Sequence, residues 1–476
     1  MKHAILLLLI AALLTGCGST PEAGSDTTTS DTTTADVTTE VTLFSDLPTG
    51  DFGGYTFKIL GLDNESEATY VQMTAEEMNG EIINDVVFER NRKIEDELNI
   101  KISYIGASAS SITQTARASI LAGNDEYDIL FDQTLKLGPA SADQIFLNIN
   151  EMDGINLEKP WWNNTLAEQL SIGGKKYMLV GDLNYQYLYN VWSLFFNQQT
   201  IDDYELESPF SLVTNGKWTI DKMVEYCRTV AQDVNSDGSY RLLDDDICGF
   251  VTNTSCFFAL LYGAGGELIQ KDGDLPVFKG ATDKMTEVYD KLLSVTTDPR
   301  VYNSYGSLGL DERFGRFANG QFLFSGMMVG SAKYLRDMQA DFGVVPFPKL
   351  DETQETYYSY AGPSMSTMAI PATATDPERT GIILENLSAH SYGTLRTAYF
   401  ETTMKDKFMR DEASVEMLDY LYSGIRMDLG YVYGFGGVQN IFMNTLRDGG
   451  GIVSALASVE PAVNEAIDTY IENISK

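Results

Sequence analysis

The stretch YTFKIL, residues 55–60, begins the pattern of segments that decides the fold. It is short, rich in β-forming side chains and bounded by glycines, which is typical of a β-strand. Apolar side chains then recur at helical spacing from Val87 to Leu98, and a second β-rich run covers Ile100 to Ile105. This order predicts a βαβ unit and therefore an α/β fold.

The next helix and strand extend this pattern and indicate where a ligand would bind. A helical pattern over residues 112–120 precedes a strand-like run over 127–131, which ends in Asp132 and Gln133. Ligands of open α/β sheets bind beyond the carboxyl ends of the strands, so we expect Asp132 and Gln133 at a cleft. The alternative for Asp132 is the N-cap of a following helix.

Five stretches, taken in their order along the chain, carry a family resemblance. They are GNDEYDI (123–129), GGKKY (173–177), LFFN (194–197), GKWTID (216–221) and DFGVVPFP (341–348). With them, the chain resembles the extracellular solute-binding lipoproteins of carbohydrate ABC importers, the clan that includes maltose- and oligosaccharide-binding proteins. The resemblance covers essentially all of residues 50–476.

The resemblance implies a two-lobed periplasmic-binding-protein-like fold of type II, in which discontinuous lobes are joined by crossing hinge strands. A ligand stabilises the closed form of such a protein only by touching both lobes, so its contacts should come from both. The expected ranges are 47–190 with 362–425 for the first lobe, 198–356 with 426–476 for the second, and 191–197 and 357–367 for the hinges.

The N-terminal segment predicts where the protein acts. An apolar run of eleven residues follows the basic N-terminus; it is too short to span a bilayer and typical of a signal peptide, here residues 1–16. Leu-Thr-Gly-Cys at 14–17 resembles the lipobox of bacterial lipoproteins, which implies acylation of Cys17, with palmitate as one expected chain; ordinary secretory cleavage is the alternative. Residues 17–46 are rich in Ser, Thr and Asp and predict a disordered tether. We therefore expect an extracytoplasmic protein anchored to the cell membrane through Cys17.

Charge and reactive side chains exclude several functions. The 33 Lys and Arg residues against 68 Asp and Glu residues give a net charge of −35, which excludes nucleic-acid binding through clustered cations. The cysteines at 227, 248 and 256 have no C-x-x-C spacing, which indicates neither a disulfide framework nor a zinc ribbon. His390, the one histidine of the mature chain, lies in an apolar pattern and is expected to pack. The sequence thus predicts no catalytic residue.

A sugar presents hydroxyl edges and apolar faces, so its site needs aromatic rings beside carboxylate or amide groups. The loop at 181–187 supplies this mixture, at a position where the resemblance implies ligand contact. Its candidates are Asp182, Asn184 and Tyr185, and the alternative is a polar turn.

Further aromatic candidates lie in both halves of the chain. Trp161 and Trp162 are adjacent, so at most one reaches a ligand; packing of both is the favoured interpretation, and Trp161 stays a candidate. Phe257 precedes a glycine turn where relatives often place an aromatic against the sugar, with core packing as the alternative. Tyr358 and Tyr360 alternate in the second crossing, so they share one side of an extended chain.

The C-terminal region holds the last aromatic candidates. In YVYGFGG (431–437) the aromatic residues alternate, and the resemblance implies that Tyr433 or Phe435 is a stacking ring. Relatives often have Gly-Pro-Trp after the strand expected at 323–328, where this chain has Val-Gly-Ser at 329–331. One customary stacking platform is therefore missing.

The stretch DVNSDGS at 233–239 has the spacing of an EF-hand-like loop, with oxygen side chains at positions 1, 3 and 5 and glycine at 6. Position 12 is an aspartate instead of the usual glutamate. We expect a structural calcium site of reduced affinity, and an Asx-type turn is the alternative. The candidate ligands are Asp233, Asn235, Asp237, Ser239 and Asp244.

These features predict a monomeric receptor that captures an oligosaccharide or simple sugar and delivers it to the permease subunits of an ABC transporter. It would perform no covalent chemistry and need no cofactor for chemistry. One alternative is a surface glycosidase acting through a pair of carboxylates. Another is a binding protein for peptides or a different polar solute.

Overall fold

The computed structural model describes most of the chain. The described residues are 43–63, 70–306, 308–335, 338–362, 364–404 and 412–476.

Contacts set Pro48–Lys476 apart as one compact unit, which holds the sheets of the described residues. The predicted signal peptide, Cys17 and the tether up to residue 42 lie outside the described residues. Among the described helices, none combines the length and the apolar composition needed to cross a membrane.

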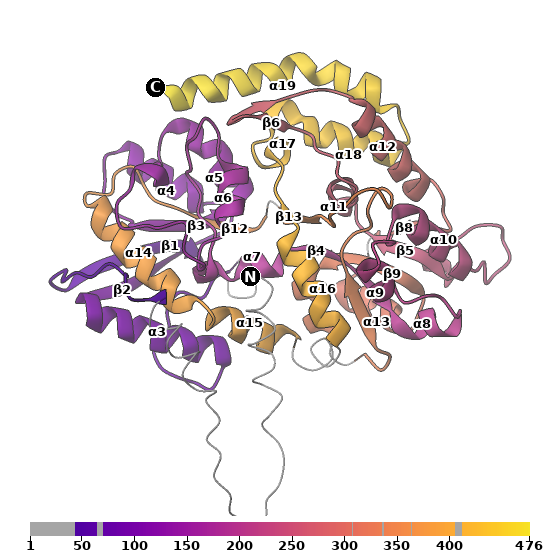
Figure 1. Cartoon of the computed structure of the whole chain (residues 1–476), viewed down its shortest axis with the longest axis horizontal. Coiled ribbons are helices and arrows are strands. Elements are labelled where there is room, and N and C mark those ends of the chain that lie inside the picture. The colour runs from indigo at the N-terminus through magenta and orange to yellow at the C-terminus, as the bar shows by residue number, and fades with distance from the viewer. Residues whose placement is uncertain (1–42, 64–69, 307, 336–337, 363, 405–411) are drawn as a thin grey trace, which may run out of the picture. The chain divides into compact units, whose positions relative to one another are not determined.

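A four-stranded sheet forms around the N-terminal βαβ unit (Figure 1). Strand β1 (Tyr55–Leu62) lies between β2 (Ile100–Ala107) and β3 (Ile129–Gln133) and runs parallel to both. This confirms the predicted βαβ unit. Strand β12 (Ser366–Ala369) pairs antiparallel with β3 and completes the order β12-β3-β1-β2. The associated helices are α3 (Ile82–Leu98), α4 (Ile112–Leu121), α5 (Thr134–Ala140), α6 (Asn164–Leu170), α14 (Pro377–Ser391) and α15 (Leu395–Met404).

A five-stranded mixed sheet forms the second group of elements, in the order β10-β4-β9-β5-β8. Strands β5, β9 and β8 are parallel, whereas β4 runs antiparallel to β9 and β10. The strands are β4 (Trp192–Asn197), β5 (Cys248–Thr252), β8 (Tyr302–Ser304), β9 (Phe322–Met328) and β10 (Phe342–Val345). The helices around them are α8 (Gln198–Asp203), α9 (Pro209–Thr214), α10 (Ile220–Val230), α11 (Cys256–Gly263), α12 (Asp283–Thr296), α13 (Leu310–Ala318) and α16 (Glu412–Ser423).

Segments distant in sequence run side by side where the chain passes between the two sheets. Val191, just before β4, forms an antiparallel bridge with Ala361. Strand β11 (Ser359–Tyr360) pairs in parallel with β13 (Ile425–Arg426). We call these paired segments the crossing segments.

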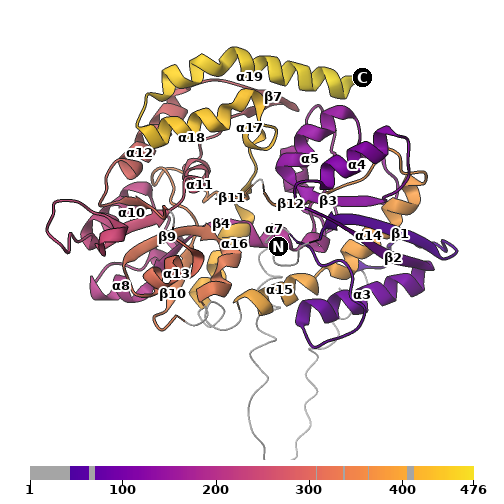
Figure 2. The same ribbon diagram turned by 180° about the vertical axis from the view of Figure 1, so that it is seen from behind.

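The C-terminal helix α19 (Ile452–Ser475) contacts both groups of elements (Figures 1 and 2). It packs against α12 and α18 (Val438–Asp448), and its Tyr470 hydroxyl lies 2.6 Å from the Ser141 hydroxyl next to α5. The lobe boundaries that we expected stay a prediction. Helix α16, which we expected in the first lobe, contacts β10 and α9. The remaining elements are α7 (Gln186–Tyr189), β6 (Gln270–Asp272), β7 (Leu275–Val277) and α17 (Leu429–Val432).

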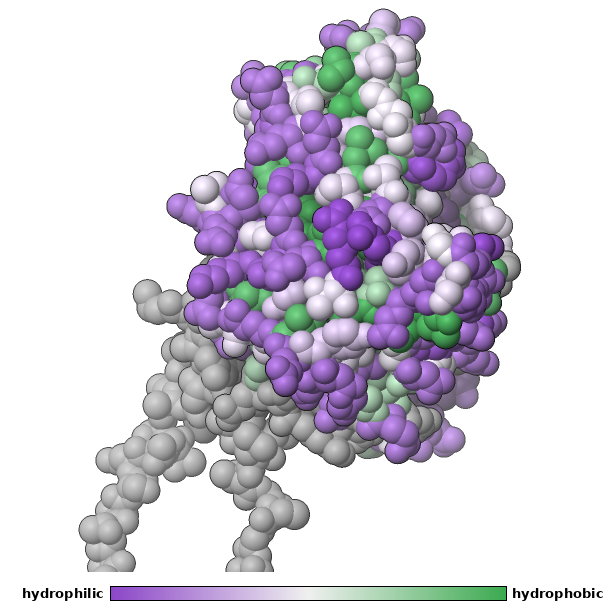
Figure 3. Space-filling view, turned by 90° about the vertical axis from the view of Figure 1, so that its right-hand side faces the viewer, coloured by the Kyte–Doolittle hydropathy of each residue, from purple (hydrophilic) through white to green (hydrophobic). Residues whose placement is uncertain are grey.

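One face of the molecule shows how hydrophilic and hydrophobic residues are distributed over the surface. On the face shown in Figure 3, hydrophilic side chains predominate and hydrophobic patches between them are small. Many large apolar side chains are instead buried around the two sheets, as in Phe57 and Phe195, which are 0 % exposed.

Candidate functional site

A cavity of about 260 Å³ lies beside the crossing segments. Its walls combine aromatic rings with hydroxyl and amide groups, the mixture expected for a polar, ring-shaped ligand. The aromatic residues are Trp192, Tyr305, Phe314, Tyr360 and Tyr431, and the polar ones are Asn253, Ser255, Arg313, Ser331 and Ser364.

The second sheet places many of these side chains. Strands β5, β8 and β9 are parallel, so their carboxyl ends meet at one edge of the sheet. Asn253 follows β5, Tyr305 follows β8, and Met327 and Met328 end β9, and all four line the cavity. The cavity therefore lies where α/β sheets bind their ligands.

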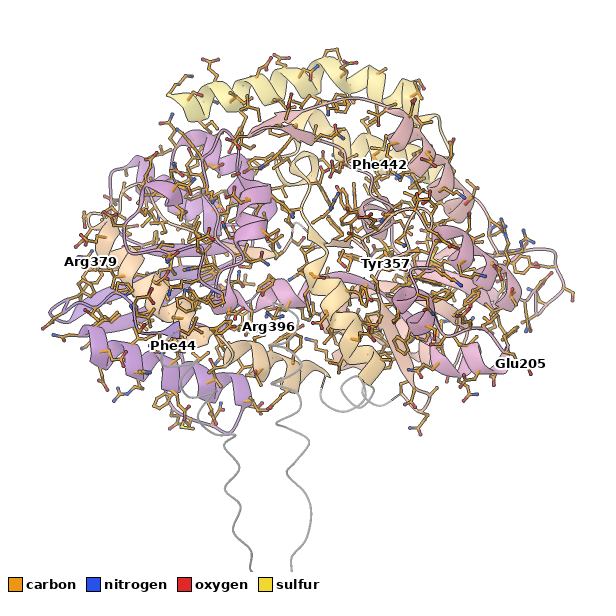
Figure 4. The ribbon with its side chains drawn as sticks, in the orientation of Figure 1. Phe44, Glu205, Tyr357, Arg379, Arg396 and Phe442 are labelled. Atoms are coloured by element: carbon orange, nitrogen blue, oxygen red, sulfur yellow. The ribbon has the colours of Figure 1, made fainter. Side chains whose placement is uncertain are left out.

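Tyr431 lines the cavity, and other aromatic rings stack against the Tyr431 ring. Its ring centroid lies 4.3 Å from that of Phe258 and 6.0 Å from that of Tyr360, at interplanar angles of 24° and 16°. Phe258 in turn packs against Phe442 of α18 (Figure 4), with 5.7 Å between the ring centroids. Tyr431 is half-buried, whereas Phe258 and Tyr360 are buried. The buried rings support Tyr431 in position to stack on a ligand.

The buried Asp428 carboxylate fixes the helix that carries Tyr431. Its Oδ1 accepts hydrogen bonds from the backbone N–H groups of Gly430 (2.7 Å) and Tyr431 (3.2 Å), which caps α17. Its Oδ2 accepts a further bond from the Leu268 N–H (2.8 Å). Burial raises the pKa of Asp428 to about 7, and the N–H bonds act against that rise by favouring the ionised form.

The two tyrosines predicted in the second crossing have different surroundings. Tyr360 lines the cavity. The Arg426 guanidinium covers the Tyr358 ring, with Cζ 3.4 Å from the ring centroid, and its Nη1 pairs with Glu267 Oε1 at 2.8 Å. Tyr358 does not line the cavity.

Asp132 and Gln133 lie at the carboxyl end of β3, as predicted, and border a space of about 10 Å³ on the first sheet. The Asp132 carboxylate is already engaged there. Its Oδ2 accepts from the Thr113 N–H (3.1 Å) and hydroxyl (2.6 Å), and its Oδ1 lies 3.2 Å from Lys136 Nζ. Asp132 thus binds the first turn of the preceding helix α4, and its role toward a ligand stays a prediction.

The three candidates of the 181–187 loop are buried and do not line the cavity at the crossing segments. The Tyr187 hydroxyl donates to Asp182 Oδ1 (3.4 Å), and Asn184 Nδ2 donates to the Ser366 carbonyl. The Tyr185 ring packs against Tyr399 with 6.0 Å between centroids. These contacts give the loop a structural role, and ligand contact by it stays a prediction.

Asp182→Asn should change how the stability of the protein depends on pH. Burial raises the pKa of Asp182 to about 6, while the positive charge of Arg396 (Figure 4) opposes the rise. The folded state therefore holds this proton more tightly than the unfolded chain, whose Asp pKa is about 3.9. Wild-type stability relative to the variant should fall by on the order of 3 kcal/mol as pH rises from about 4 to about 6, and stay constant outside this window.

Urea unfolding of both proteins across this pH range measures the effect. Asp290→Asn, the same substitution at an exposed position on α12, is the matched control. A difference between wild type and Asp182→Asn that is flat from pH 4 to 8 contradicts the prediction.

Trp161 and Trp162 pack together on one buried carboxylate. Their Nε1 groups donate to Glu385 Oε1 (3.1 Å) and Oε2 (2.8 Å), and Trp161 is 0 % exposed. Phe257 is also buried, with its ring centroid 5.4 Å from that of Tyr302. None of the three lines the cavity. These contacts favour the packing alternatives that we gave for Trp161 and Phe257.

Tyr433 and Phe435 stack on each other away from the cavity lining. Their ring centroids are 5.5 Å apart at an interplanar angle of 7°, and the Tyr470 ring of α19 packs edge-on against both. The aromatic residues that alternate in YVYGFGG do not share one side of the chain, because residues 429–432 form the short helix α17. On a helix, side chains two residues apart point in different directions, so Tyr431 lines the cavity and Tyr433 is buried.

The predicted calcium loop is closed by its own hydrogen bonds. Asp233 Oδ2 accepts from the Gly238 N–H (2.8 Å), and Asp237 Oδ1 accepts from the Ser239 N–H (2.8 Å). The Arg241 guanidinium pairs with Asp237 (2.9 Å) and Asp244 (3.1 Å). No group of His, Cys, Asp and Glu that could hold a metal ion is found among the described residues. The calcium site, Asn235 included, stays a prediction.

Most of the cavity residues were not among our sequence candidates. Trp192 lies inside the first predicted crossing, and this position in a hinge could have marked it as a candidate for ligand contact. Ser331 belongs to the Val-Gly-Ser segment noted as a departure from the relatives. Arg313 and Phe314 lie on a helix whose facing cannot be read from one sequence, and Tyr305 follows a three-residue strand.

No family model matches the sequence, and no curated protein shows significant similarity to it. Solved structures do match in fold. A cyclic α-maltosyl-1,6-maltose-binding protein from Arthrobacter globiformis has a TM-score of 0.58 at 15 % identity, over 87 % of this chain and 99 % of its own.

Two further structures match over similar lengths. The galacto-N-biose/lacto-N-biose I-binding protein of an ABC transporter from Bifidobacterium longum has a TM-score of 0.56 at 13 % identity, over 88 % of this chain and 98 % of its own. UgpB from Mycobacterium tuberculosis, solved with glycerophosphocholine, has a TM-score of 0.55 at 14 % identity, over 88 % of this chain and 99 % of its own. The chain therefore has the two-lobed α/β fold of these binding proteins, as predicted.

Proposed function

We propose that this protein is an extracytoplasmic receptor that captures a carbohydrate and delivers it to the permease of an ABC importer. The observation that carries the proposal is the cavity of about 260 Å³ at the crossing segments. Its rings can stack on the C–H faces of a sugar, and its amide and hydroxyl groups can pair with sugar hydroxyls. The fold shared with sugar-binding proteins supports the same function.

Capture would work through closure of the two lobes about the crossing segments. The second sheet and the crossing segments supply most of the cavity walls, while Asp132 and Gln133 end a strand of the first sheet. A ligand that touches both walls stabilises the closed form by its differential affinity for that form. The permease would then recognise the closed, monomeric receptor, and no covalent step is needed.

The proposal includes attachment to the membrane through a lipidated Cys17 and the tether that follows it. Mass spectrometry of the mature N-terminus checks the anchor. It also includes calcium at the 233–244 loop, where the ion would have to displace Arg241 from Asp237 and Asp244. Thermal unfolding with and without added calcium checks the ion.

The two alternatives differ from this proposal in the chemistry that they require. A glycosidase needs two carboxyl groups about 5 to 9.5 Å apart around its substrate. Among the described residues, no Asp or Glu lines the cavity, which favours binding over hydrolysis. A different polar solute stays open as an alternative because UgpB, which has the same fold, was solved with glycerophosphocholine.

A thermal-shift panel followed by calorimetry tests the proposed function. Mono- and oligosaccharides, peptides and glycerophosphodiesters are added to the purified chain, and we expect at least one saccharide to raise the melting temperature. Saturation at about 100 times the dissociation constant stabilises the folded state by about 2.7 kcal/mol, which is easily measured. Stabilisation by peptides or phosphodiesters alone, or release of cleavage products from a glycan, would contradict the proposal.

A further inference from the structure

We propose that the captured saccharide carries an anionic group, and that Arg313 binds this group. The inference rests on the proposed function and specifies the class of ligand. Arg313 is the one charged residue among the described residues that line the cavity. The absence of Asp and Glu from this lining contrasts with a chain that has 68 of them.

Two contacts hold the Arg313 guanidinium in place, and they engage only its Nε donor and one face of its plane. Its Nε donates to the Leu308 carbonyl (2.9 Å), and its Cζ lies 4.6 Å from the centroid of the Tyr305 ring. Tyr305 is buried, and its hydroxyl is hydrogen-bonded to the Ser325 hydroxyl. These contacts fix the plane of the guanidinium, and both Nη groups stay available to a ligand because neither donates a hydrogen bond to another described residue. Two parallel N–H donors fit a carboxylate or a phosphate.

Arg313 differs from many arginines in this chain because no carboxylate of the described residues pairs with it. Arg228 and Arg300 both pair with Asp298, at 2.9 Å and 2.8 Å, and Arg316, one turn further along α13, pairs with Glu312 at 3.0 Å. An arginine that lies beside a cavity and pairs with no carboxylate of the described residues is suited to an anionic partner from solution.

The position of Arg313 on its helix strengthens the argument. It lies in the N-terminal half of α13 (Leu310–Ala318), where the helix dipole disfavours a positive charge and favours a bound anion. The acidic residues of the first turn, Asp311 and Glu312, are exposed and do not line the cavity. A second cation, Lys333, lies 5.1 Å from the Tyr334 ring, which stacks on Phe314 of the cavity wall at 5.0 Å.

The net charge of −35 does not prevent binding of an anion. At physiological salt the Debye length is about 8 Å, so distant surface carboxylates are screened. The charges nearest to the cavity therefore decide whether an anion binds there. The nearest charge here is the Arg313 guanidinium. Two sources supply an anion on a sugar: the carboxylate of a uronic acid and the phosphate of a sugar ester.

Calorimetry on the full chain in detergent, with matched ligand pairs, tests the inference. The pairs are digalacturonate with galactobiose, and glucose 6-phosphate with glucose, so that each pair differs in its anionic group. We expect at least one anionic member to bind at least about tenfold more tightly than its neutral partner. Arg313→Gln should weaken that binding by about 10- to 100-fold and so remove most of the preference for the anionic member of the pair, since hydrogen bonds to charged groups contribute about 1.5–3 kcal/mol.

Two further variants keep this test independent of folding. Arg313→Lys keeps the positive charge but not the two parallel N–H donors, so we expect an intermediate loss of affinity for the anionic ligand. Arg447→Gln removes an exposed charge on α18 and should leave the affinity for every ligand of the two pairs unchanged. Preference for digalacturonate assigns the anion to a carboxylate, and preference for glucose 6-phosphate assigns it to a phosphate. Neutral sugars that bind as tightly as both anionic ones overturn the inference but leave the proposed function intact, whereas no binding by any saccharide overturns both.

Discussion

Tyr431→Ala is expected to weaken sugar binding by about 10- to 100-fold. Tyr431 lines the cavity, and the rings of Phe258 and Tyr360 hold it from behind, so the variant removes a supported stacking surface. Aromatic residues in such desolvated, well-packed positions dominate binding energy. Because Tyr431 is only half-buried, the cost to folding should be smaller than for a core ring. Calorimetry with the saccharide found by the panel measures the affinity.

Two companion variants sharpen this test. Tyr431→Phe keeps the ring and should keep most of the affinity. Tyr358→Ala removes a nearby tyrosine that carries the Arg426 guanidinium and does not line the cavity, so it should leave binding unchanged. Equal affinities in wild type and Tyr431→Ala would remove this ring from the site.

The fold could be predicted because its signals are local. The strand at 55–60 and the helix that follows have side-chain periods set by the backbone, and β1, α3 and β2 form at those places. The two-lobed architecture came from the order of several weak stretches. Helix α16 shows where prediction from local patterns ends, because its contacts with β10 depend on tertiary packing that no local pattern records.

The site was harder to predict because its residues meet only in three dimensions. Tyr360 was a candidate because of its position in a crossing segment, and it lines the cavity. Tyr431 was not a candidate, because the alternating aromatic residues of YVYGFGG pointed to Tyr433 and Phe435, whereas Asp428 caps a short helix there that places Tyr431 at the cavity. Arg313 gives no signal in one sequence, because its value depends on which side chains surround it and on the lack of a carboxylate partner among the described residues.

Phe435→Ala is expected to destabilise the protein strongly and to leave sugar affinity unchanged. Phe435 is 3 % exposed and lies parallel to Tyr433, with Tyr470 of α19 against both rings. Truncating a buried phenylalanine to alanine costs about 3–5 kcal/mol, because apolar burial is lost and a cavity remains. The surrounding backbone has little room to collapse, since a Cβ on Gly436 would lie 2.5 Å from the Val463 backbone nitrogen. Urea unfolding measures the loss of stability.

This variant also separates the two roles that the sequence left open for the C-terminal aromatic segment. If Phe435 were a stacking ring, its removal would lower affinity and leave the free energy of unfolding nearly unchanged, the reverse of what burial predicts. Phe435→Leu keeps most of the buried volume, so it should fold well enough for calorimetry even where Phe435→Ala does not. Wild-type affinity in Phe435→Leu, together with a loss in Tyr431→Ala, would assign binding to the cavity wall and packing to the ring pair under α19. A loss of affinity in Phe435→Leu without a loss of stability would instead place Phe435 against the ligand.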